Sequence, residues 1–223
     1  MGEAIGTALP LAVGVSLSPV PIIGVVLMLG TPRAKQNSLA FLAGWIGGMA
    51  VVGAVVLAVS SGAGASSGGD SATWVSVLKL VLGLLLLLVG VRQWRGRPRA
   101  GEEAPMPAWM RSIDAFRAPK SAGLGVLLSS VNPKNVLLVV AAAAAIAGTG
   151  ISTGQQAVAL AVFVVVATLG PAVPVAIYFA KGAGAKSILD GLRAWMSHNN
   201  AAIMCVICVI IGAKLIGDAI GGF

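Results

Sequence analysis

The chain has 223 residues, a formal net charge of +8, 57% hydrophobic residues and only 10% charged residues. A soluble domain carries about a quarter charged residues, so this chain lacks the polar surface of a water-soluble globule. The composition therefore argues against a soluble enzyme, a nucleic-acid-binding protein and a secreted disulfide-stabilised domain. It predicts an all-α polytopic membrane protein.

Apolar segments of about 20 residues, the length needed to cross a bilayer, occur six times along the chain. They are residues 4–30, 38–60, 73–92, 122–147, 154–180 and 200–220. The first is expected to be a membrane span and not a cleaved signal peptide, because no basic residue precedes its apolar run. The predicted organisation is a three-helix unit (1–92), a basic cytoplasmic linker (93–121) and a second three-helix unit (122–223).

Basic residues are confined to alternate connections between these spans, apart from three lysines inside the spans. Such one-sided placement predicts that the basic connections face the cytoplasm and that both termini lie outside. The twelve basic residues of these connections are Arg33, Lys35, Arg92, Arg95, Arg97, Arg99, Arg111, Arg117, Lys120, Lys181, Lys186 and Arg193.

Two stretches beside these connections have the apolar spacing of short helices lying on the membrane surface. Ala108–Arg117 and Ser187–Met196 each place apolar residues on one face and basic residues on the other. The simpler interpretation is that they anchor the loops, and the functional one is a gate or a lipid-headgroup contact. In the fifth span, residues 170–174 (Gly-Pro-Ala-Val-Pro) predict a break that acts as a hinge or a static kink.

The centres of the first and fourth spans carry similar interruptions. Span one contains Ser18-Pro19-Val20-Pro21 and span four contains Asn132-Pro133-Lys134-Asn135. Proline supplies no N–H and clashes with the preceding turn, so each break leaves carbonyl groups without helical partners. Pro-interrupted segments at corresponding positions of two halves are typical of a transporter's binding site at the bilayer midplane. With three spans in each half, they predict two inverted three-helix repeats.

The predicted substrate-binding site lies at these two breaks. A lysine near a helix centre costs roughly 2.5 kcal/mol or more, so Lys134 is rarely accidental there. It suits a site for a carboxylate or phosphate, or a proton-coupled step. The competing interpretations are packing kinks without a ligand and a Lys134 side chain that snorkels towards the inner surface. The predicted site residues are Ser18, Pro19, Pro21, Asn132, Pro133, Lys134 and Asn135.

The other two intramembrane lysines lie near the predicted outer surface and suggest an outer vestibule. Lys79 lies in span three, while Lys214 and Asp218 in span six have the i, i+4 spacing of an ion pair. Both lysines could instead snorkel outward. Cys205 and Cys208 lie inside the last apolar block, where a buried structural role is favoured over redox or metal chemistry. No metal cluster, cofactor motif or nucleophile–base pair is apparent in the sequence.

The motif at residues 132–138, Asn-Pro-Lys-Asn-Val-Leu-Leu, resembles the Asn-Pro-Lys signature of the lysine exporter superfamily. That superfamily pairs it with a Pro-containing motif in the first span, here Ser18–Pro21. Length, the basic central loop and small-residue content most resemble the peptidoglycolipid-addressing proteins of actinobacteria. The resemblance implies a six-helix bundle with inverted repeats in the plasma membrane, a homodimer, and export of an amino acid, an ion or a cell-envelope lipid or its precursor. The related thiol-electron carriers place cysteines at the positions of Val20 and Lys134, which argues against electron transfer there.

The leading functional hypothesis is a secondary-type exporter, not an enzyme, that works by alternating access without a cofactor. Its substrate would be anionic or zwitterionic, such as a cell-envelope (glyco)lipid, a precursor of one, or an amino acid. The first alternative is an accessory membrane protein of a lipid-export machine with no transport activity of its own. The second is a thiol-redox carrier. Expected partners are membrane lipids, a second copy of the chain and the lipid-export machinery, with no nucleic acid.

Overall fold

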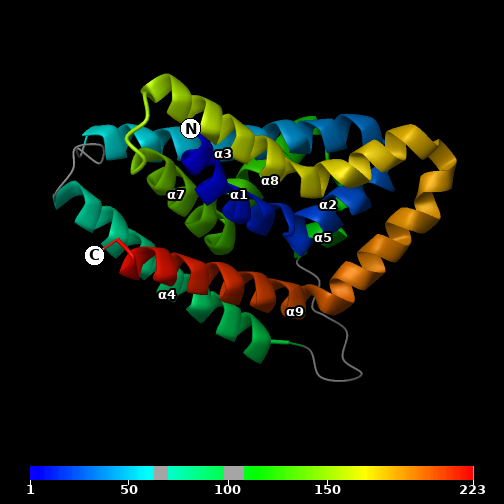
Figure 1. The fold of residues 1–223 in the computed structure, drawn as a ribbon. Coiled ribbons are helices and arrows are strands. Elements are labelled where there is room, and N and C mark those ends of the chain that lie inside the picture. The colour runs from blue at the N-terminus through cyan, green and yellow to red at the C-terminus, as the bar shows by residue number, and fades with distance from the viewer. Residues whose placement is uncertain (63–69, 98–107, 223) are drawn as a thin grey trace.

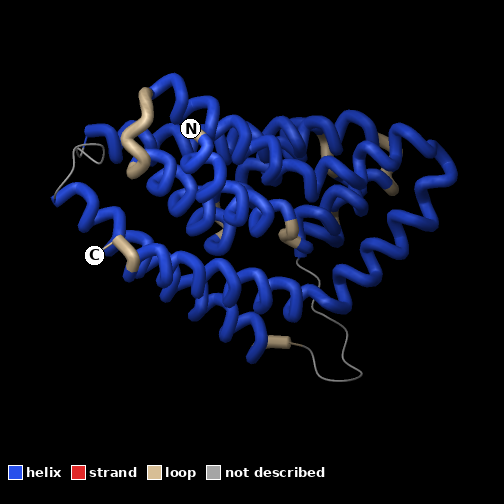
Figure 2. Tube along the Cα trace, viewed as in Figure 1, coloured by secondary structure: helices blue, strands red, loops and turns tan. Residues whose placement is uncertain are grey.

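The computed structural model describes residues 1–62, 70–97 and 108–222, and every regular element in these ranges is a helix. Figure 2 shows helix almost throughout, with loops only at breaks and turns. In chain order the elements are α1 (Gly2–Ser16), α2 (Pro19–Leu29), α3 (Ala34–Gly62), α4 (Asp70–Arg95), α5 (Ala108–Arg111), η1 (Ile113–Ala115), α6 (Ala118–Ser130), α7 (Pro133–Ala147), α8 (Thr153–Lys181), η2 (Gly182–Gly184) and α9 (Ala185–Ile220).

The helices are long and apolar enough for a multi-pass membrane protein. Four of them, α3, α4, α8 and α9, could each cross a bilayer unaided. Two bent pairs reach that length together: α1 with α2, bent by 51°, and α6 with α7, bent by 64°. The described chain thus has four candidate spans, or six if each bent pair is one span. The sequence-based prediction of an all-helical polytopic membrane protein is confirmed at this level.

Both bends occur where the sequence places a proline after a small polar residue. Ser18 and Asn132, which precede the prolines, have extended backbone angles (φ −77°, ψ 111° and φ −62°, ψ 118°). A residue before proline is driven out of the helical region, and proline is well tolerated as the first residue of the next helix. Pro19 begins α2 and Pro133 begins α7. The predicted interruption of the first and fourth spans is therefore present at the predicted residues.

The fifth span is not interrupted as predicted, while the hinge or static kink at residues 170–174 stays a prediction. Helix α8 continues from Thr153 to Lys181 with Pro171 and Pro174 inside it. A proline inside a membrane helix removes one backbone hydrogen bond but need not end the helix, because packed neighbours and local adjustments compensate.

Small residues allow several helices to approach one another closely. Helix α6 packs along α3, and α9 along α4. At the first interface a Cβ added to Gly44 would overlap the Ala122 carbonyl, and one added to Gly125 would overlap the Phe41 carbonyl. Figure 1 shows α4 beside the second half of α9, and α8 near α3 on the opposite side of the molecule. This packing fits the rule that small residues let membrane helices touch backbone to backbone.

Helix α9 is longer than predicted. Its 36 residues span about 54 Å, well beyond the hydrocarbon thickness of about 30 Å. Residues 187–196, expected to form a separate surface helix, are its first part, and Figure 1 shows this part at an angle to the rest. Leu189 and Met196 are buried there. The apolar face that predicted a membrane-surface helix instead packs partly against protein.

The other expected surface helix, Ala108–Arg117, is divided into the short helices α5 and η1. Met110 and Ile113 are buried, and Met110 belongs to a cluster with Ile22 and Ile23 of α2. The segment therefore packs against the start of the bundle. Figure 1 places both chain termini towards one end of the molecule and the corner between α8 and α9 at the other.

Candidate functional site

The two helix breaks lie against each other in the interior of the bundle. Lys134, in the first turn of α7, reaches across to the end of α1, where its Nζ donates to the Gly14 carbonyl at 2.7 Å. The same ammonium donates to Ser18 Oγ, also at 2.7 Å. The structure thus brings Ser18, Lys134 and Asn135 together from sequence positions more than a hundred residues apart. The site is a polar junction between the broken spans.

The break in the first span leaves carbonyl groups without helical partners, and Lys134 donates a hydrogen bond to one of them. In an uninterrupted helix the Gly14 carbonyl would accept from the Ser18 amide, which here donates to the Val15 carbonyl at 3.1 Å. The hydroxyl of Ser18 also lies 2.6 Å from that carbonyl. The Gly14 carbonyl is then available to the ammonium. A lysine in the second half of the chain therefore satisfies a backbone group exposed in the first half.

The break in the fourth span is satisfied in the same manner by its own side chains. Asn135 Nδ2 donates to the Leu128 carbonyl at 3.0 Å, and this bond orients the amide oxygen towards Ser18 Oγ at 2.9 Å. Asn132 caps α7, with its Oδ1 accepting from the Lys134 amide at 3.2 Å. The single proton of the Ser18 hydroxyl has two acceptors within reach, the Val15 carbonyl and Asn135 Oδ1. Ser18 is the hub of the network.

The ammonium of Lys134 is buried without a carboxylate partner among the described residues. The side chain is only 1% exposed, and the ion pairs of the described ranges join Lys186 to Asp190 and Lys214 to Asp218. Its acceptors are a carbonyl and a hydroxyl, and it lies at the C-terminal end of α1, where the helix dipole favours a cation. Snorkelling of Lys134 is therefore wrong for this conformation, because the packed end of α1 covers the side chain. The amino group of Lys134 therefore has a carbonyl and a hydroxyl as its hydrogen-bond partners among the described residues.

The predicted site residues divide into those that touch the network and those that shape it. Ser18, Lys134 and Asn135 form it, and Asn132 contributes the helix cap. The prolines Pro19, Pro21 and Pro133 start the two inner helices without polar side chains of their own. Sequence reasoning missed the carbonyls of Gly14, Val15 and Leu128. A backbone group leaves no trace in residue type, and only the proline four or five residues onward signals that it is freed.

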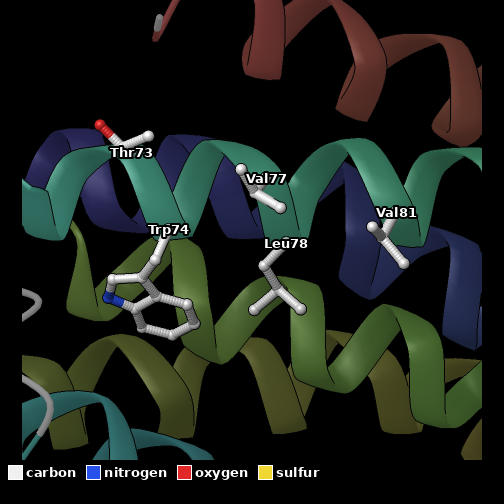
Figure 3. A pocket seen from close by; sticks show the side chains of 5 residues that line it. All are labelled: Thr73, Trp74, Val77, Leu78 and Val81. Carbon is white, nitrogen blue, oxygen red and sulfur yellow. The ribbon is translucent and has the colours of Figure 1, made fainter.

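The proposed vestibule residues lie away from this network. Lys214 Nζ pairs with Asp218 Oδ2 at 2.5 Å, so the predicted i, i+4 ion pair is present, with both side chains about one-third exposed. Lys79 is half-buried on α4. An apolar groove of about 580 Å³ lies on the same part of α4, and its lining residues, drawn in Figure 3, are Thr73, Trp74, Val77, Leu78 and Val81. The groove fits hydrocarbon better than a polar ligand.

The two cysteines are free thiols on α9, with Cys208 buried and Cys205 half-buried. In the part of the chain that the structure describes, no group of three or more His, Cys, Asp or Glu side chains could hold a metal ion. The described residues therefore offer no metal site of this kind around the cysteines, and the redox role stays a hypothesis.

Ser18→Ala is expected to lower the free energy of unfolding by about 1–3 kcal/mol, because it leaves buried polar partners unsatisfied. Tryptophan fluorescence during unfolding in detergent measures this change. Ser112→Ala is the matched control, because Ser112 is exposed and bonds only to the nearby Trp109 carbonyl. Equal stability of the two variants would contradict a central role for Ser18.

The fold and site define a multi-pass helical membrane protein with a cationic polar junction between two broken spans. The chain matches the family model described as Sap, sulfolipid-1-addressing protein, over residues 8–221, and it belongs to that family. It is also 29% identical over 224 aligned residues to the sulfolipid-1 exporter Sap of Mycobacterium tuberculosis, covering 89% of this chain and 92% of that protein. The resemblance to actinobacterial lipid-addressing proteins is thereby confirmed. No solved structure matches the chain.

Proposed function

We propose that this protein exports an anionic or zwitterionic cell-envelope lipid, or a precursor of one, by alternating access around the junction of the broken spans. The observation that carries the proposal is the buried ammonium of Lys134, which bonds to Gly14 and Ser18 and lacks a carboxylate partner among the described residues. An intramembrane cation held this way is expected to serve a substrate or ion pathway. The Mycobacterium tuberculosis relative is a sulfolipid-1 exporter, which supports a lipid as the cargo.

The proposed mechanism exchanges the neutral acceptors of Lys134 for an anionic group of the substrate. In the described conformation the ammonium is closed off between α1 and α7. Separation of these helices would free the ammonium and the carbonyls of the two breaks. A carboxylate, phosphate or sulfate group adds to the hydrogen bond the attraction between opposite charges, which a carbonyl or a hydroxyl acceptor does not supply. Substrate binding would therefore favour the opened junction.

Two inverted repeats, and the orientation of the chain in the membrane, form part of this proposal. The packing of the helices supports the repeats when α1, α2, α3 and α4 are taken to correspond to α6, α7, α8 and α9. Helix α3 contacts α6, and the corresponding pair α8 and α1 is also in contact; likewise α2 contacts α9, and the corresponding pair α7 and α4 is in contact. The contact of α1 with α7, which forms the polar junction, departs from this exchange. We place the basic connections in the cytoplasm and both termini outside, because positive charge in short loops sets orientation. The plasma membrane location, a homodimer and coupling to an ion gradient belong to the same proposal.

An accessory role in a lipid-export machine is the second candidate, and one observation favours it. Because Lys134 already has two hydrogen bonds and is buried, it could act as a permanent cross-link between the two halves. In that case the polar junction would hold the bundle together and never open.

Flux measured with purified protein in liposomes separates these candidates. We expect protein-dependent movement of a labelled anionic lipid across the bilayer, with protein-free liposomes and a labelled amino acid as the two comparisons. Because the proposed cargo is a lipid, the amino acid should not move. No lipid movement, together with a stable co-purifying partner from the native membrane, would favour the accessory role over the exporter.

A further inference from the structure

A recess lies at the corner where the chain turns from α2 to α3 and where α8 ends. It consists of two adjoining cavities of about 440 and 370 Å³, which share Lys35 and Tyr178. The first cavity adds the basic turn around Arg33, and the second adds Phe179 and Gly182. Gly182 has a positive φ of 52°, a backbone conformation that glycine adopts readily and that ends α8 at this corner. The recess is distinct from the Lys134 junction and shares no residue with it.

One wall of the recess is cationic and has no counter-charge. Arg33 and Lys35 are exposed, and neither takes part in the ion pairs of the described residues. No carboxylate lines either cavity. The guanidinium of an arginine matches the oxygens of a phosphate or sulfate with two parallel hydrogen bonds, and lysine adds a point charge. The wall therefore has the chemistry to hold a singly or doubly charged oxyanion.

The recess is also lined by two aromatic residues, Tyr178 and Phe179. The rings of Tyr178 and Phe179 pack edge to face with centroids 5.7 Å apart, and Phe179 remains 49% exposed. Tyr178 is half-buried, and its ring packs against the hydrophobic core. Aromatic residues of this kind gather where the hydrocarbon meets the headgroups. A ligand that fills the recess must therefore present an anionic group to the basic residues and apolar atoms to the aromatic ones.

We propose that this recess binds the phosphate or sulfate ester headgroup of an anionic membrane lipid, with Arg33 and Lys35 on the oxyanion and Phe179 against the start of the acyl chains. The inference rests on the proposed function only for the cytoplasmic placement of the basic connections. It adds a second lipid site, at the level of the inner headgroups, to the junction at Lys134. A lipid from the inner leaflet would bind in this recess before it reaches the junction at Lys134.

Binding of dioctanoyl phosphatidylglycerol to the purified full-length protein in phosphatidylcholine nanodiscs tests the inference without requiring transport. The double variant Arg33→Gln/Lys35→Gln is expected to weaken binding by about tenfold, because it removes the charge-assisted hydrogen bonds of both side chains to the headgroup oxyanion in the recess. The matched control is Arg92→Gln/Arg95→Gln, which removes the same charge from exposed residues at the end of α4. That control should stay within about twofold of the wild type.

Two further measurements complete the test. Phe179→Ala keeps every charge and should still weaken lipid binding, which a purely electrostatic patch would not do. Inorganic phosphate and sulfate should compete only at far higher concentration than the lipid. Equal loss in the two double variants, or no loss in either, would overturn the site, and competition by the free anions at lipid concentrations would overturn the assignment to a lipid. Flux through liposomes is measured separately, so failure here leaves the exporter proposal standing.

Discussion

Lys134→Gln is expected to reduce flux of an anionic lipid by at least about tenfold, a loss of about 1.4 kcal/mol in favourable interaction with the substrate. Glutamine keeps hydrogen-bond donors at the end of a side chain one atom shorter and removes the positive charge. The charge has no carboxylate partner among the described residues. Its removal therefore weakens the attraction for the substrate and leaves no carboxylate of the described protein unpaired. The variant should therefore fold while losing transport. Flux of labelled lipid in proteoliposomes measures the effect.

The comparison of two substrates makes this prediction specific to an anion-binding role. If Lys134 binds an anionic group, flux of an anionic lipid should fall more than flux of a zwitterionic lipid. If it only holds α1 and α7 together, both should fall equally. Lys214→Gln is the matched control, because Lys214 is also intramembrane but is paired with Asp218. Wild-type flux in Lys134→Gln would remove the basis of the proposed mechanism.

The parts of the fold that could be predicted from the sequence are those set by local chemistry. The breaks before Pro19 and Pro133 are dictated by the missing N–H and by the restricted backbone of the preceding residue. The Lys214–Asp218 pair follows from helix geometry alone. By contrast, Pro174 also follows a residue with a Cβ, Val173, but lies inside a continuous helix. Whether a proline ends a membrane helix depends on the packing around it, which one sequence does not encode locally.

The side chains of the candidate site could be predicted from the sequence, but their hydrogen-bond partners could not. Lys134 and Asn135 stood out because charged and amide groups are costly in hydrocarbon. Their partners, the carbonyls of Gly14 and Leu128, are visible only once α1 and α7 are placed together. The same holds for residues 187–196, whose amphipathic pattern suits a membrane surface and a protein surface equally. Apolar periodicity identifies a face but does not identify what covers it.

Helix α8 contacts the backbone at the end of α1, directly beside the polar junction. Gly170 of α8 approaches Ser16 so closely that an added Cβ would overlap the Ser16 carbonyl. Ser16 is the last residue of α1, two residues before the hub hydroxyl of Ser18. A backbone atom cannot rotate away as a flexible side chain can. Any side chain at position 170 must therefore push α8 away from the polar junction.

Gly170→Ala is accordingly expected to cost about 1–3 kcal/mol of folding stability, the range found when a packed interior is overfilled. Unfolding in detergent, followed by tryptophan fluorescence, measures the loss. Gly191→Ala in α9 is the control, because nothing lies within 4 Å of a Cβ added there. Alanine favours a helix over glycine by up to about 1 kcal/mol, so the control should be neutral or stabilised. If Gly170→Ala were stabilised as well, α8 would not pack against the end of α1, and the described junction would lack the support that keeps Lys134 buried.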